Sequence, residues 1–249
     1  CFNLGVKWHN GEGGPKDVRK ARQMYDQACS GGNAEGCIGL GFMWGNGEGG
    51  PKDERKAREL FEKACSGGDA RGCSNLGRMW KDGEGGPKDE RKAREIYEQA
   101  CSGGSGLACS NLGVMWGNGQ GGPKDEHKAR ELAEKACSGG EIRSCSNLGF
   151  MWAAGQGGPK DERKAREVYE QACSSGSALA CWNLAFMWQK GEGGPKDERK
   201  ARELFGQACS GGEFQSCSNL GVMWINGEGG PKDERKAREL FGQACSGGD

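Results

Sequence analysis

The sequence lacks an excess of charge of either sign, and it lacks any long apolar run. Its 249 residues contain 35 Lys and Arg against 35 Asp and Glu, with only 2 His. Nucleic-acid-binding domains carry a basic stripe or patch, so this balance argues against nucleic acid as a partner. A membrane-spanning helix needs about 20 predominantly apolar residues, and no stretch approaches that length. We therefore expect no nucleic-acid partner and no membrane span in this segment.

No group of unique residues suggests a catalytic or metal centre. Catalysis requires a base set against a nucleophile or a metal, but the residues that occur only once in the pattern, such as His9, His127 and Phe214, share no spacing. Common zinc sites also combine Cys and His at spacings that this chain does not offer. We expect no catalytic residue, no cofactor and no metal ion.

What the sequence does contain is a repeat of 36 residues. The motif Gly-x-Gly-Gly-Pro-Lys-Asp begins at residues 11, 47, 83, 119, 155, 191 and 227. Such a period is the signature of a repeat architecture, in which each repeat packs only on its neighbours. We therefore expect one solenoid over residues 1–249, as a window on a longer array. Its repeats are 1–36, 37–72, 73–108, 109–144, 145–180, 181–216 and 217–249.

Each repeat predicts two helices joined by a turn. In the repeat at 73–108, Cys73 and Trp80 lie on one face of a first helix, and Gly83 follows where a glycine ends a helix. Asp89 can then cap a second helix. The Gly-Gly-Pro-Lys-Asp segment between the helices is not a phosphate loop, because it lacks the Gly-Lys-Ser/Thr ending and its Asp occupies the helix N-terminus.

Two other features have structural interpretations. We expect Glu54 with Arg58, and Arg55 with Glu59, to form exposed ion pairs at i, i+4 spacing. We also expect the Trp that every repeat keeps to lie in the core. Trp182 occurs once in the pattern, so it is a better candidate for contact with a partner.

The cysteines point to an oxidising compartment. Fourteen of them recur at separations of 8 and 28 residues, which indicates a ladder of disulfides. Cys29 can pair with Cys37 across the short turn, or with Cys1 across the longer loop. Chain-entropy stabilisations of roughly 2.6 and 3.6 kcal/mol for the two loops differ too little to decide. Reduced thiols in a cytosolic protein are an alternative, and so is a lipid on Cys1.

Positions that vary between repeats at helical spacing are candidates for a binding surface. On the first helices they form a stripe that is mainly apolar, with a basic step at Arg71, Arg78 and Lys81, and it suits an extended peptide or a partner's helix. The same side chains could instead pack between repeats, or vary because nothing constrains them. The candidate partner-binding residues are Ile38, Phe42, Arg71, Arg78, Lys81, Leu107, Val114, Arg143, Phe150, Leu179, Trp182, Phe186, Val222 and Ile225.

The repeat resembles a known family. The run LGxMWxxGxGGPKDxRKAxxxYxxAC is similar to the Sel1-like repeat, a relative of the tetratricopeptide repeat, and its two cysteines make it most similar to the cysteine-rich secreted bacterial branch. The resemblance covers all seven repeats. It departs from the family in having Trp where Tyr is usual, Gly-Pro in the turn, and Ala133 where other repeats have Tyr or Phe.

The resemblance implies an all-α fold, namely a right-handed α/α solenoid of seven helix-turn-helix repeats stapled by disulfides. It favours the cysteine pairing eight residues apart, with partners for Cys1 and Cys245 in repeats beyond each end. The implied pairs are Cys29 with Cys37, Cys65 with Cys73, Cys101 with Cys109, Cys137 with Cys145, Cys173 with Cys181, and Cys209 with Cys217.

By the same resemblance, the first helices line a concave surface, and the protein is a non-enzymatic scaffold that binds a protein or peptide in an extracellular or periplasmic space. One alternative is a fibre or surface assembly built by end-to-end stacking of copies. A further alternative is penicillin binding or weak lactamase-like activity, associated with some cysteine-rich relatives. This chain has no Ser-x-x-Lys, Ser-Asp-Asn or Lys-Thr-Gly motif for it.

The disulfide ladder makes the first prediction. In the freshly isolated protein under non-reducing conditions, the internal cysteines should resist a thiol-alkylating reagent, and peptide mapping should recover them as pairs eight residues apart. Intact mass before and after alkylation measures the number protected. If all fourteen cysteines alkylate in the native protein, both the ladder and the exported location are wrong.

Overall fold

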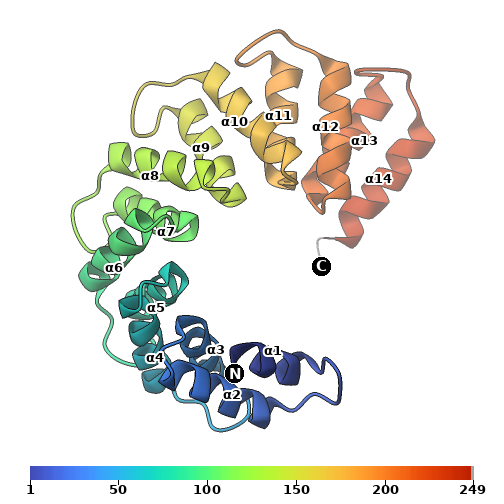
Figure 1. The fold of residues 1–249 in the computed structure, drawn as a ribbon. Helices are drawn as coiled ribbons and strands as arrows, with labels where there is room; N and C mark the ends of the chain where they lie inside the picture. Colours follow the sequence, from blue (N-terminus) through green and yellow to red (C-terminus); the bar gives the residue numbers. More distant parts are fainter. Residues whose placement is uncertain (248–249) are drawn as a thin grey trace. The chain divides into compact units, whose positions relative to one another are not determined.

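The computed structural model describes residues 1–247, which form fourteen α-helices and no β-strand (Figure 1). Each repeat is a helix-turn-helix pair, so the predicted all-α repeat fold is confirmed. The first helices are α1 (Phe2–Asn10), α3 (Ala34–Asn46), α5 (Ala70–Asp82), α7 (Gly106–Asn118), α9 (Ile142–Ala154), α11 (Ala178–Lys190) and α13 (Phe214–Asn226). The second helices are α2 (Val18–Ser30), α4 (Glu54–Ser66), α6 (Glu90–Ser102), α8 (Glu126–Ser138), α10 (Glu162–Ser174), α12 (Glu198–Ser210) and α14 (Glu234–Ser246).

The chain forms two compact units, residues 1–125 and 126–249. In the first unit, α3 packs on α4 and α5, and α5 packs on α6 and α7. In the second unit, α9 packs on α10 and α11, and α11 packs on α12. The first helices α3 and α5, α5 and α7, and α9 and α11 therefore contact one another directly. The division falls between α7 and α8, and the single solenoid over both units stays a prediction.

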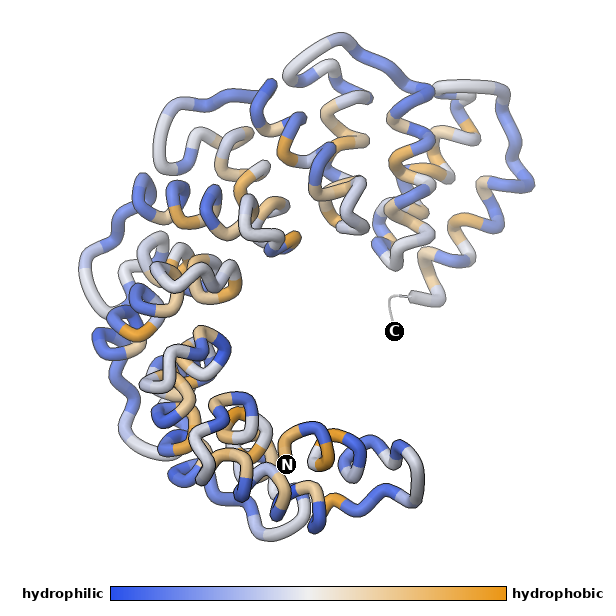
Figure 2. The backbone as a smooth tube through the Cα atoms, viewed as in Figure 1, coloured by the Kyte–Doolittle hydropathy of each residue, from blue (hydrophilic) through white to orange (hydrophobic). Residues whose placement is uncertain are grey.

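The turns follow the chemistry that the sequence predicts. Gly83 ends α5 in the left-handed region with φ of 79°, and the Asp89 carboxylate accepts a hydrogen bond of 3.0 Å from the Lys92 backbone N–H at the start of α6. Gly85 is required by a close approach, because a Cβ atom there would lie 2.2 Å from the carbonyl oxygen of Glu54 in the preceding repeat. Figure 2 shows these loops in blue and near-white, whereas the apolar residues are concentrated in the helices.

Six disulfides join the end of each second helix from α2 to α12 to the start of the next first helix. Each pair is separated by 8 residues, with Cα atoms between 4.4 and 4.8 Å apart. The short pairing that the family resemblance favours is therefore confirmed, and the pairing across the Gly-Gly-Pro loop is wrong for these cysteines. Cys1 and Cys245 are exposed and unpaired in the described residues.

The arginine of the repeated Lys-Ala-Arg segment is buried, which corrects the expected ion pair between Glu54 and Arg58. The Arg58 side chain is only 7% exposed. Its guanidinium donates hydrogen bonds to the carbonyl oxygens of Glu84 at 2.8 Å and of Met79 at 3.1 Å. Met79 lies in the last turn of α5, where the helix dipole favours a cation. Arg58 therefore links its own repeat to the following one.

The tryptophans lie at the same junction. The Trp80 ring is half-buried between two cations, with the Arg58 guanidinium 4.2 Å and the Lys92 ammonium 3.9 Å from the ring centroid. Trp188 has the same environment between Arg166 and Lys200. The expectation of a Trp core is thus corrected in part: Trp188 packs against the core but is only partly buried, and its electron-rich face attracts cations of two repeats.

The apolar core lies between the helices of each unit. Phe61, Met79, Tyr97 and Leu112 are fully buried in the first unit. In the second unit a cluster that includes Phe205 and Leu184 runs from α8 to α13. Burial raises the pKa of Tyr97 above its usual range, because the phenolate would lose its hydration.

The buried arginine makes the second prediction. Replacing Arg166 with Ala removes hydrogen bonds to the carbonyl oxygens of Met187 and Pro195 and the stacking on Trp188. We expect a loss of roughly 2–4 kcal/mol in the free energy of unfolding, measured by urea denaturation with the disulfides intact. The control is Arg163→Ala, because Arg163 is exposed on the same helix. Equal losses in the two variants would contradict the junction role.

Candidate protein-binding surface

Each first helix has one face that stays exposed to solvent. In α7 this face consists of Leu107, Asn111, Val114 and Asn118, at positions i, i+4, i+7 and i+11 of the helix. Leu107 and Val114 are 53% and 49% exposed. We call these four positions, and their equivalents on the other first helices, the open face.

Apolar side chains are frequent on the open face, although water contact costs them free energy. The exposed fraction of six candidate residues lies between 44% and 53%. They are Phe42 on α3, Leu107 and Val114 on α7, Phe150 on α9, Leu179 on α11 and Val222 on α13. Ile225, three residues beyond Val222, is 43% exposed. For these side chains, packing between repeats does not account for the apolar character.

Two of the aromatic side chains are held from one side. The Phe42 ring packs edge-on against the buried Phe61 ring, with centroids 5.2 Å apart. The half-buried Phe186 ring packs in the same way against Phe205 at 5.1 Å, and Trp182 lies 5.0 Å from Phe186 on the same helix. These contacts hold the rings in one conformation. A partner that binds them therefore loses less side-chain conformational entropy on binding.

Part of the predicted stripe turns away from the open face. Ile38, three residues after the stripe begins on α3, is 9% exposed and belongs to the core. The equivalent Ser74 is buried, and its hydroxyl lies 3.2 Å from that of Ser105, which caps α7. On α5 and α9 the side chain at this position therefore contacts the cap residue of the next first helix, and the position after it belongs to the open face.

The basic step on α5 is neutralised by carboxylates. Arg71 forms ion pairs of 2.8 Å with both Glu35 of the preceding repeat and Asp69. The remaining members of the step are also paired, Arg78 with Glu84 and Lys81 with Asp82. The sequence showed the cations but not these contacts, so the expected positive surface is corrected to a balanced one. Arg143 on α9 is exposed.

The open face also contains an asparagine that sequence reasoning missed. Asn75, Asn111, Asn147, Asn183 and Asn219 occupy the i+4 position on five successive first helices. Asn147 is exposed and the other four are half-buried. Only positions that vary between repeats were considered as a binding surface, and this position is Asn on every first helix except α3, where it is Gly39. Its combination of constancy, polarity and helical register with Leu107 and Val114 was the signal available.

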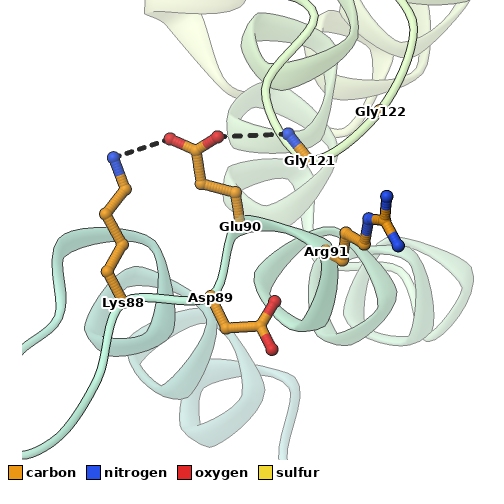
Figure 3. Close-up of a pocket in the computed structure, with 6 residues that line it drawn as sticks. All are labelled: Lys88, Asp89, Glu90, Arg91, Gly121 and Gly122. Atoms are coloured by element: carbon orange, nitrogen blue, oxygen red, sulfur yellow. Dashed lines mark hydrogen bonds and ion pairs between the residues drawn. The ribbon is translucent and has the colours of Figure 1, made fainter.

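The glycine loops do not form an anion site. At the junction shown in Figure 3, the Glu90 side chain bridges the Lys88 ammonium at 2.7 Å and the Gly121 backbone N–H at 3.2 Å. The Lys88 and Gly121 groups that could contact a phosphate therefore already bind a carboxylate of the chain. These contacts pull the Glu90 pKa below its ordinary value, first through the Lys88 hydrogen bond. Glu54 and Glu162 make the same contact with Gly85 and Gly193.

The described residues contain neither a metal-binding cluster nor a membrane-spanning helix. No cluster of three His, Cys, Asp or Glu side chains within 1–247 is arranged to hold a metal ion. In the same residues, every helix is too short or too polar to cross a membrane.

The family model named Sel1 repeat matches the chain seven times. The matched residues are 1–33, 34–69, 70–105, 106–141, 142–177, 178–213 and 215–249. This chain belongs to the Sel1 repeat family. Its Sel1 repeats match helix pairs, because each match from the second to the sixth begins at a first helix and ends before the next one.

Solved Sel1 structures resemble this chain closely in fold. A protective antigen present in uropathogenic Escherichia coli strains has 28% sequence identity and a TM-score of 0.91, over 98% of this chain and 52% of the antigen. This chain thus spans about half the length of that relative. A Sel1 repeat protein from Oxalobacter formigenes has 22% identity and a TM-score of 0.78, over 98% of this chain and 96% of that one.

Cysteine rich protein B of Helicobacter pylori is 32% identical over 53% of this chain and 96% of its own, with a TM-score of 0.45. No curated protein sequence matches this chain. Sel1 repeat proteins are typically scaffolds for protein–protein interaction, and the Sel1 fold is generally not catalytic.

The ion pairs on α5 of the third Sel1 repeat make the third prediction. The hydrogen bond from Arg71 lowers the pKa of Asp69 below its ordinary value of 3.8. Asp69 therefore contributes stability above pH 3.8, and that contribution is lost as the pH falls through the lowered pKa. Arg71→Ala should raise the Asp69 pKa, measured from its carboxyl chemical shift by NMR. The exposed Arg91, replaced by Ala, is the control. An unchanged Asp69 pKa in Arg71→Ala would contradict the assignment.

Proposed function

We propose that this chain is an exported, non-enzymatic scaffold that binds a partner polypeptide on the open face of its first helices. The observation that carries the proposal is the row of Phe150, Phe186 and Val222. These residues occupy the same position on α9, α11 and α13, successive first helices of the second compact unit. Contiguous exposed apolar surface on a soluble domain marks an interaction site.

The polar groups around this surface favour recognition of the partner by its shape over recognition by its charge. The cations on α5 in the first unit are paired with carboxylates, and in the second unit the Gln189 amide donates a 2.9 Å hydrogen bond to Glu228 of the next repeat. A rim of paired groups around apolar anchors is the usual anatomy of a protein interface. We expect binding that changes little with ionic strength.

The disulfides support an exported location. Each of the six junctions between neighbouring repeats has one disulfide. Forming these bridges requires an oxidant during folding, whereas thiols in the cytosol are kept reduced. The bridges also suit a scaffold, because they hold each pair of neighbouring repeats together without using the open face.

Site-specific photo-crosslinking makes the fourth prediction. A photoreactive phenylalanine analogue at position 150 or 222, in protein expressed in its exported form, should give discrete adducts with a partner polypeptide. The same analogue at the exposed Gln171 on α10 is the control. Discrete adducts at 150 and 222 alone are expected because the partner covers the open face. Equal crosslinking at all three positions, or none at any, would overturn the proposal.

A further inference from the structure

Asparagine followed by glycine occurs at the end of four first helices. All four asparagines are exposed, and the pairs are Asn10–Gly11, Asn46–Gly47, Asn118–Gly119 and Asn226–Gly227. Glycine has no side chain to obstruct its backbone nitrogen, and its backbone rotates more freely than that of any other residue. This nitrogen can therefore attack the preceding side chain, so that the asparagine deamidates without an enzyme.

The reaction begins at the glycine backbone nitrogen. The nitrogen loses its proton and bonds to the side-chain carbonyl carbon Cγ of the asparagine, the Cγ–Nδ2 bond breaks, and Nδ2 leaves as ammonia. Water then adds to either carbonyl carbon of the cyclic imide and opens it to aspartate or isoaspartate. Water is consumed and ammonia released in equal amounts, and nothing is oxidised or reduced. Both the glycine N–H and the asparagine side chain must therefore be free to leave their hydrogen bonds.

Two of the four sites have almost the same local sequence but different contacts. Residues 44–50 read Trp-Gly-Asn-Gly-Glu-Gly-Gly, and residues 116–122 differ only in having Gln120 in place of Glu48. The Asn46 side-chain amide donates a 3.1 Å hydrogen bond to the Glu48 carboxylate. The asparagines that end α1 and α13 donate the equivalent bond, both at 3.0 Å. At these three sites, the hydrogen bond must break before Cγ can reach the backbone nitrogen.

Asn118, at the end of α7, is held less firmly. Within the described residues its side-chain amide makes no hydrogen bond. The Gly119 N–H is shared between the carbonyl oxygens of Met115 and Trp116, and its nitrogen lies 3.4 Å from the Trp116 oxygen, beyond the usual range. By contrast, the glycine that ends α13 donates a bond of 2.9 Å to a single carbonyl oxygen. Both reacting groups are therefore less restrained at Asn118.

The local charge acts in the same direction. When the glycine nitrogen loses its proton it becomes negative, and a neighbouring carboxylate opposes this ionisation. Glu48 lies two residues after Asn46, whereas the neutral Gln120 lies two residues after Asn118. The free amide, the weak backbone hydrogen bond and the neutral neighbour thus all favour reaction at the same site.

We propose that Asn118 is a deamidation site, at which the open face of α7 gains a carboxylate as the protein ages. In the third repeat the equivalent residue is Asp82, and Gly83 still ends α5 with φ of 79°, so this helix end accommodates a carboxylate. Asp82 pairs with the preceding Lys81, whereas Asn118 follows Gly117, which has no charge. The reaction therefore changes the open face of α7 from neutral to negative. This inference does not depend on the proposed function.

Deamidation kinetics make the fifth prediction. The disulfide-intact chain is incubated in mildly alkaline buffer, and peptide mapping by mass spectrometry follows the replacement of amide by carboxyl at each Asn-Gly site. We expect Asn118 to react at least about tenfold faster than Asn46, because one hydrogen bond to a charged group changes a rate by about this factor. In the reduced and denatured chain, where these contacts are absent, the two rates should converge.

Exchange of the neighbouring residue tests the cause. Gln120→Glu should slow the reaction at Asn118 by about tenfold, and Glu228→Gln should accelerate it at Asn226 by a similar factor. The amide introduced by Glu228→Gln can still accept the hydrogen bond from Gln189, so the contact between these repeats is retained. Asn118→Ala should abolish the mass change in this peptide and leave the other three sites unchanged. Circular dichroism and disulfide mapping verify that each variant is folded.

Three results would overturn the inference. The first is native Asn118 that reacts no faster than Asn46, or does not react. The second is a difference of the same size in the denatured chain, because the local sequence and not the structure would then cause it. The third is Gln120→Glu with an unchanged rate at Asn118. None of these results bears on the scaffold, which crosslinking at positions 150 and 222 tests separately.

Discussion

The contact between a buried arginine and the tryptophan of the next repeat fixes how successive repeats pack. Removing a guanidinium from water is costly, and the cost is offset here by carbonyl oxygens at the C-terminal end of the next first helix and by the electron-rich indole face. Each such contact lies close in sequence to a disulfide between the same two repeats. Orientation and proximity of neighbouring repeats are therefore determined by different groups.

This division explains why the open face can vary. The second helix and the loops supply the arginine, the glycine turn and the cysteine, and these are the same in nearly every repeat. The first helix contributes its inner side to the core. Side chains such as Val114 and Phe150 are about half exposed and lie outside that core. Substitution there changes the surface and leaves the junction intact. A repeat scaffold can thus alter what it binds without altering how it folds.

The sequence predicted the fold well because the period repeats every local signal seven times. Helix ends at Gly83 and Asp89 follow from backbone chemistry that acts within a few residues. Arg58 was misjudged because its partners, Glu84 and Met79, lie in the next repeat, and i, i+4 spacing gives no information about them. The pairing of Arg71 with Glu35 could not be predicted for the same reason, because Glu35 lies in the preceding repeat. Asn147 was missed because only positions that vary between repeats were taken as candidates for binding.

The short turns between paired cysteines give the chain a further property. Ser102, Gly103 and Gly104 are exposed between Cys101 and Cys109, so this turn is open to proteolytic cleavage. A cut there breaks the polypeptide, yet the disulfide still joins α6 to α7. The same geometry recurs at all six bridges. Such a chain can be nicked at these exposed turns while each disulfide keeps the two neighbouring helices attached.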